Sequence, residues 1–182
     1  NWSGAALLPS LFESIHVAGR RHTYVFVAFT AEETGLTGSK FYVDKLGKEG
    51  LAKISAMVNI DSVGAGPTRV EVERGAQKLI RTLAGMGEVL HVPVEFVNFH
   101  QVGLSDSDSF QDKKVPAVAV HSLNQQSFKL LHTRNDQMSA MRLDDYYDTY
   151  QLLRAWLSYL DHYLDSPMEV PDTKPGKSSE NK

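Results

Sequence analysis

The sequence of 182 residues contains no cysteine. A thiolate metal site, a thiol nucleophile and a disulfide are therefore excluded, and any bound metal ion must be held by His, Asp or Glu. No apolar run approaches the roughly 20 residues that a membrane-spanning helix requires. The net charge of -3 argues against nucleic acids and anionic membranes as partners, because neither sign is in large excess.

An initiator methionine and a signal peptide are also missing, since the chain starts at Asn1 and passes directly into a helix-like pattern. We therefore interpret it as a piece of a longer protein. Residues 1–165 are expected to form most of one catalytic domain, because a chain of this length can bury a substantial core. Residues 166–182 contain too few apolar residues to fold and are expected to be a disordered tail.

Strand-like apolar segments alternate with amphipathic helical patterns along the rest of the chain. This alternation predicts an α/β fold with a mostly parallel sheet. Ser3 is the expected N-cap of the first helix, and Gly47 is expected to end the second. The first helix should bury Leu8, Leu11, Phe12 and Ile15 and end at Gly19. The expected strands cover residues 24–29, 54–60, 69–73, 93–97 and 116–121, and the helices after the first cover residues 39–46, 77–90 and 143 to about 164.

Two adjacent carboxylates, Glu32 and Glu33, directly follow the apolar segment 24–29. That segment predicts a strand buried on both faces, and ligands of open α/β sheets bind beyond the carboxyl ends of such strands. Adjacent carboxylates repel each other, so they are tolerated where a cation lies between them or where they share a proton. The alternative is a pair of solvated loop glutamates.

Further metal-binding side chains occur in the loops after other predicted strands: Asp61, Asp106 with Asp108, and His132. Each has a structural alternative, because Asp61 could cap a turn, Asp106 could cap a helix and His132 could be an ordinary loop histidine. A parallel sheet brings all these loops to one edge. Carboxylate and imidazole ligands with one spare carboxylate as a base are what a hydrolytic zinc site requires.

Six segments occur in an order that matches a known family. They are NWSGAA at 1–6, FVAFTAEETGLTGS at 26–39, VNIDSVG at 58–64, SDSDSF at 105–110, VPAV at 115–118 and HTRND at 132–136. Together they resemble the co-catalytic zinc aminopeptidases of the bacterial leucyl aminopeptidase type, whose relatives include glutamate carboxypeptidase and glutaminyl cyclase. The resemblance implies the three-layer αβα zinc-peptidase architecture without its N-terminal part.

This resemblance implies a zinc-dependent exopeptidase that hydrolyses N-terminal residues from peptide substrates with a free N-terminus. Glu32 matches the general base. Glu33 and His132 match ligands of one zinc ion, and Asp61 matches a ligand of the other. Asp106 and Asp136 match family positions that support these ligands. The resemblance implies two zinc ions in an intact domain. It also implies that the protein is secreted or periplasmic, as members of the family are.

The sequence departs from the family pattern at three places. The family's bridging aspartate directly precedes the Asn-x-Ser-Gly motif, which here begins at Asn1, and the upstream His-x-Asp motif is absent as well. We therefore expect this chain to bind one zinc ion or none and to be inactive alone. Leu131 occupies a position where many relatives have an aromatic residue, and Ser107 occupies a position where many have His.

Two other functions remain open at this stage. A glutaminyl cyclase-like acyltransferase would use a single zinc ion and a Trp-lined pocket, but the chain contains only Trp2 and Trp156, and Trp156 falls on the core face of the last helix. A non-catalytic binding domain, like the transferrin receptor relatives, would be expected to have lost ligand residues. Glu32, Glu33, Asp61 and His132 are all present here.

Overall fold

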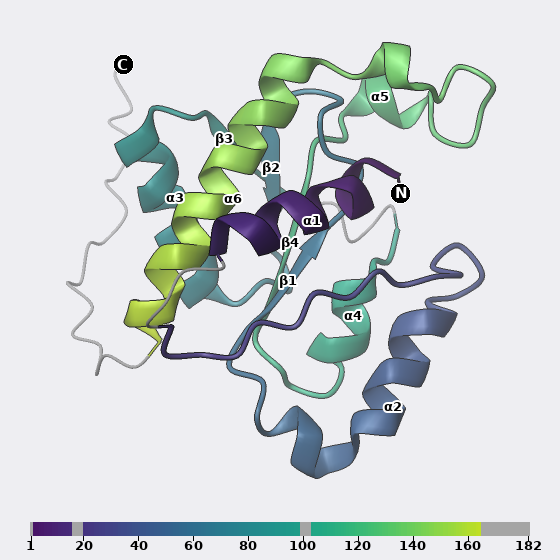
Figure 1. Ribbon diagram of the computed structural model, residues 1–182. Helices are drawn as coiled ribbons and strands as arrows, with labels where there is room; N and C mark the ends of the chain where they lie inside the picture. The colour runs from purple at the N-terminus through teal and green to yellow at the C-terminus, as the bar shows by residue number, and fades with distance from the viewer. Residues whose placement is uncertain (1, 16–19, 99–102, 165–182) are drawn as a thin grey trace, which may run out of the picture.

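The structure, a computed structural model, describes residues 2–15, 20–98 and 103–164 (Figure 1). The expected tail 166–182 and the expected helix end at Gly19 lie outside these residues. The helices are α1 (Trp2–Ile15), α2 (Thr37–Leu51), α3 (Gln77–Leu90), α4 (Asp106–Gln111), α5 (Gln125–Phe128), the short 3-10 helix η1 (Met138–Ala140) and α6 (Leu143–Tyr163). The strands are β1 (Met57–Ile60), β2 (Thr68–Glu71), β3 (Val94–Val97) and β4 (Ala117–His121).

These strands form one mixed sheet with the order β1-β4-β2-β3. The pairs β1–β4 and β2–β3 are parallel, and β2–β4 is antiparallel. All five residues of β4 are buried, which explains why its sequence, AVAVH, is an almost uninterrupted apolar run. The predicted α/β class with a mostly parallel mixed sheet is confirmed.

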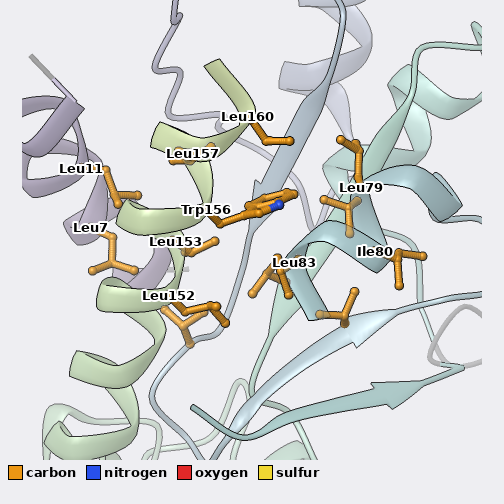
Figure 2. Packing of buried hydrophobic residues seen from close by; sticks show 14 of the residues in the cluster. Leu7, Leu11, Leu79, Ile80, Leu83, Leu152, Leu153, Trp156, Leu157 and Leu160 are labelled. Atoms are coloured by element: carbon orange, nitrogen blue, oxygen red, sulfur yellow. The ribbon is translucent and has the colours of Figure 1, made fainter. Parts of the chain in front are cut away.

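Helices cover both faces of the sheet, so the molecule has three layers. On one face, α1, α3 and α6 pack with the sheet around Trp156, which lies between the leucines of α3 and the rest of α6 in Figure 2. On the other face, a smaller cluster of Val43, Phe110 and Val115 joins α2 and α4 to the sheet. The predicted core face of the last helix is confirmed, since α6 buries Leu153, Trp156, Leu157 and Leu160. No helix among the described residues is long and apolar enough to cross a membrane.

The first two helices differ from the prediction in detail. Ser3 lies inside α1 and is not its N-cap, because the helix already begins at Trp2. Phe12 is 48% exposed and contacts Phe26 edge-on, so it is not a core residue. The buried face of α1 is Gly4, Leu7, Leu11 and Ile15. Gly47 does not end α2 but kinks it, with φ 60° and ψ −176°, and helical structure resumes to Leu51.

The predicted buried strand at residues 24–29 is wrong. This segment is not part of the sheet, and none of its residues makes a backbone–backbone hydrogen bond to another described residue. It runs between α1 on one side and α2 with α4 on the other (Figure 1). Tyr24 donates a hydrogen bond to the Leu157 carbonyl at 2.7 Å, and Phe29 packs against Tyr42. The predicted burial on both faces is wrong as well, since Val25 and Ala28 are exposed and the other four residues are only partly buried. A strand also needs a paired neighbour.

Asp161 of α6 fixes the start of this segment. Its two carboxylate oxygens accept the backbone N–H groups of Arg21 and His22, each at 2.9 Å. Burial alone would raise the pKa of Asp161, but these two hydrogen bonds and the His22 ring hold it below its usual value. The segment that leads to Glu32 is thus tied to the longest helix.

Candidate active site

A cavity of about 470 Å³ lies between the extended segment and β1. One wall is formed by residues 27–34 and the other by residues 57–61, and α1 contributes Gly4, Ala5 and Leu8. Four of the predicted site residues line this cavity: Glu32, Glu33, Asp61 and Asp106. The sheet and its helical layers therefore bring carboxylates together from three separate parts of the sequence.

The loop that carries Glu32 and Glu33 is a tight turn at the start of α2. The Glu32 carbonyl accepts the N–H groups of Gly35 at 3.1 Å and Leu36 at 2.8 Å. Burial raises the pKa of the half-buried Glu32 carboxyl, and the negative charges of Asp61, Asp106 and Glu33 raise it further. Glu32 is therefore easier to protonate than an ordinary glutamate.

Asp61 directly follows β1 and lines the same cavity. Its backbone N–H donates to the Val120 carbonyl at 3.0 Å, which continues the β1–β4 ladder, and the Ser62 hydroxyl donates to Asp61 Oδ1 at 3.0 Å. Burial raises the pKa of Asp61, although the hydrogen bonds from Ser62 act in the opposite direction. A cation beside this carboxylate would offset the free energy that its burial costs.

Asp106 is the first residue of α4 and is buried. It is not the helix cap, since Ser105 occupies the N-cap and forms a capping box with Asp108. Asp106 Oδ1 has no hydrogen-bond partner among the described residues, and burial raises the pKa of this carboxyl while a hydrogen bond from Ser39 lowers it. Ser107, which replaces the histidine of many relatives, makes a 2.7 Å hydroxyl contact with Ser105.

His132 contacts the loop that carries Glu32 and Glu33, although it lies far from that loop in the sequence. Its Nδ1 atom lies 3.3 Å from Glu33 Oε1, and both side chains are about two-thirds exposed, at 66% and 64%. The Asp136 carboxylate accepts the His132 backbone N–H at 3.3 Å, so Asp136 supports the loop that carries His132. Leu131 beside it is only partly buried.

The predicted metal-binding residues are thus only partly assembled. Within residues 2–15, 20–98 and 103–164, no group of three or more His, Asp or Glu side chains could hold a metal ion. Glu33 and His132 are in contact, and the negative charge of Glu33 acts on Asp61, whose pKa it raises. The donor types, carboxylate oxygen and imidazole nitrogen, are those that zinc prefers, so the residues present fit a part of a zinc site.

Backbone strain marks the same three loops. Ala31, Ser62 and His132 have φ angles of 56°, 47° and 61°, in the left-handed region that residues with a side chain rarely adopt. Such strain is often concentrated at functional sites, because the surrounding structure must hold the residue in place. The sequence contained no signal for it, since none of the three is glycine.

These features agree with comparisons to known proteins. A family model described as peptidase family M28 matches residues 3–157. The chain belongs to peptidase family M28. It is 26% identical over 128 residues to aminopeptidase YwaD of Bacillus subtilis, a match that covers 68% of this chain and 27% of that protein.

Solved structures show the same fold. A zinc aminopeptidase from Bacillus subtilis superimposes with a TM-score of 0.77 at 21% identity, over 87% of this chain and 41% of that chain. A glutaminyl cyclase from an Acidobacteriales bacterium superimposes with a TM-score of 0.59 at 15% identity, over 70% of this chain and 46% of that chain. The chain therefore spans less than half the length of these relatives, and it matches the aminopeptidase more completely than the cyclase.

Proposed function

We propose that this chain carries part of the active centre of a zinc-dependent exopeptidase that removes N-terminal residues from peptides. The observation that supports this most directly is that Glu32, Glu33 and Asp61 line one cavity, with His132 in contact with Glu33. Membership of a peptidase family and similarity to an aminopeptidase support the same function.

In this proposal, Glu33 and His132 hold one zinc ion and Asp61 holds a second. Bound zinc would activate a water molecule and polarise the scissile carbonyl. Glu32 takes up the proton of the attacking water and delivers it to the leaving amine. Bound zinc would offset the neighbouring negative charges and favour the ionised form of Glu32, which is the form that accepts a proton. The surrounding carboxylates would also attract the positively charged amino group of a peptide.

We further propose that the competent centre needs ligands beyond these residues. The family pattern places a bridging aspartate before the Asn-x-Ser-Gly motif and an imidazole ligand further upstream, and neither has a counterpart in this sequence. The partial assembly of Glu33, Asp61 and His132 supports this proposal. A cyclase-like pocket is less well supported, because no tryptophan lines the cavity in the described part of the chain.

The first test measures zinc per chain by elemental analysis on this polypeptide and on a form extended N-terminally to include the expected aspartate. We expect two zinc ions in the longer form and one or none here. In the longer form, Glu32→Gln should keep the zinc but lower kcat for amino-acid p-nitroanilides by about 10²–10⁴-fold. His132→Ala should lower zinc occupancy, whereas His91→Ala, at the exposed end of α3, should not.

Zinc in neither form would contradict the proposal and favour a non-catalytic binding domain. Release of ammonia from N-terminal glutaminyl peptides, without peptide cleavage, would favour the cyclase. Near wild-type turnover in Glu32→Gln would show that Glu32 is not the base.

A further inference from the structure

The strand β3 forms one end of the sheet, far from the carboxylates. Among the described residues β3 pairs only with β2, so its other edge is open. The Val97 carbonyl accepts the Val72 N–H at 3.1 Å, so the backbone of Val97 faces the side of β2. Successive residues of a strand direct their N–H and C=O groups to opposite edges, so those of Val94 and Phe96 point to the open edge. Such an edge is a template for pairing with another chain.

The surface between this edge and α3 is hollowed. A groove of about 540 Å³ lies there, and its lining includes Ala84, Val92, Val94 and Phe96. The Phe96 side chain is 49% exposed. Because the burial of apolar surface is favourable, the groove favours apolar side chains from a strand that pairs with β3.

The outer flank of α3, which we define as Arg81, Ala84 and Glu88, carries charges that are complementary to themselves. The other flank faces α6, where Trp156 donates to Thr82 Oγ1 at 3.0 Å (Figure 1). Arg81 and Glu88 are exposed, and at about 10 Å along the helix they are too far apart to pair with each other. Two antiparallel copies of α3 would bring each Arg81 opposite the Glu88 of the other copy. This pattern favours a second copy of the chain as the partner.

One two-fold axis fits both the helix and the strand. The helix α3 joins the parallel strands β2 and β3, so α3 and β3 run in opposite directions. A Cβ on Gly87 would lie 2.7 Å from Val94, so these two residues are level. The midpoint of Arg81 and Glu88 lies about 4 Å before Gly87 along α3, which corresponds to about one residue after Val94 along β3. The axis therefore passes beside Glu95.

We propose that two copies of this chain form a symmetric dimer through β3 and the outer flank of α3, which joins their two four-stranded sheets into one. With Glu95 at the axis, Val94 of each copy lies opposite Phe96 of the other. Their edge-facing N–H and C=O groups then bond to each other, and each Phe96 ring covers the groove of the other copy. The two Glu95 side chains are tolerated side by side because Arg69 Nε donates to each at 2.7 Å.

The spacing of the helices agrees with this arrangement. Leu83 of α3 shares a core cluster with Val70 of β2, and Gly87 lies against Val94 of β3, so α3 lies over both strands. Paired strands are about 4.8 Å apart, which places the two copies of α3 about 10 Å apart across the axis. This is the usual separation of packed helices, roughly 8–10 Å. The dimer goes beyond the proposed peptidase function and needs no metal.

The first test is sedimentation equilibrium of the chain and of charge variants over a range of concentrations. We expect a monomer–dimer equilibrium. Arg81→Glu and Glu88→Arg should each weaken the dimer at least about 10-fold, because like charges would face each other at two symmetry-related places, and the double variant should restore it to within about 3-fold. The control Arg154→Glu, at an exposed position of α6, makes the same change in net charge as Arg81→Glu and should alter the affinity by less than about 2-fold.

The second test examines the register. The chain has no cysteine, so Glu95→Cys introduces a single thiol. Directly opposite residues of this kind have Cα atoms about 4.5 Å apart, within the roughly 4.4–6.8 Å that a disulfide spans. Mild oxidation should therefore link two copies through residue 95. The control Glu49→Cys, at an exposed position of α2, should remain monomeric on denaturing gels.

Other results would overturn the proposal. A chain that stays monomeric at every concentration would do so, as would a dimer that neither single charge reversal weakens or that the double variant fails to restore. Equal cross-linking of Glu95→Cys and Glu49→Cys would show that β3 does not pair with its copy. Zinc binding and turnover enter none of these measurements, so failure here is distinguishable from failure of the peptidase proposal.

Discussion

Lowering the pH should destabilise this protein through His121, the last residue of β4. The side chain is 6% exposed, and its Nδ1 atom accepts the Leu123 N–H at 3.0 Å. Burial lowers the pKa of His121 to about 4, and the positive charge of Arg69 on the neighbouring strand lowers it as well. The folded protein therefore keeps this imidazole neutral at pH values where the unfolded chain binds a proton.

The sign and size of the effect follow from linkage. As the pH falls below the ordinary histidine value of 6.5, the unfolded chain takes up the proton first, so stability declines until about pH 4. The two pKa values correspond to about 3 kcal/mol, at 1.36 kcal/mol per pH unit. This is a large part of the free energy of unfolding of a typical domain, which is roughly 5–15 kcal/mol.

The assay is urea unfolding at pH 7, 5.5 and 4 of the wild type and of His121→Asn. Asparagine retains an acceptor for the Leu123 N–H but does not titrate. The wild type should lose about 3 kcal/mol more stability than His121→Asn between pH 7 and 4. His91→Asn is the control, because His91 is exposed and caps α3 with a left-handed φ that asparagine tolerates. Equal pH dependence of the wild type and His121→Asn would refute the reasoning.

Two further predictions concern the loop geometry and the core. Gly38→Ala should destabilise the protein by about 1–3 kcal/mol and displace the Glu32 loop, because the added Cβ would lie 2.9 Å from the Thr30 N atom. Gly85→Ala in α3, where the added Cβ meets nothing within 4 Å, should stabilise the protein by about 0.5–1 kcal/mol. Urea unfolding measures both, and a stabilised Gly38→Ala or a destabilised Gly85→Ala would contradict this reasoning. Trp156→Ala should cost about 3–5 kcal/mol in thermal unfolding, since Trp156 is 0% exposed and donates to Thr82 Oγ1 at 3.0 Å. The matched change Trp2→Ala, at a residue 62% exposed, should cost less than about 0.5 kcal/mol, and similar losses in both variants would show that Trp156 is not a core residue.

Elements with a strong and unambiguous period were predictable from the sequence. The helical period of α3 fixes which of its faces is buried, and α3 has the predicted bounds. The nearly all-apolar run of β4 requires a strand that is buried on both faces. The face of α1 was not predictable in this way. Leu7 and Leu8 are adjacent, and packing against α6 rather than local spacing decides that Leu7 is buried.

The sequence by itself determined the α/β class, the family and the candidate side chains, because these follow from local periodicity and from motifs in a fixed order. Only the tertiary structure decided which of these side chains meet. Glu33 and His132 are in contact because two distant loops converge, and Asp61 lines the same cavity as Glu33. Residues 24–29 are as apolar as a buried strand, yet they make no backbone–backbone hydrogen bond to any residue that the structure describes. Pairing depends on a neighbouring backbone, and no property of a segment's own residues supplies one.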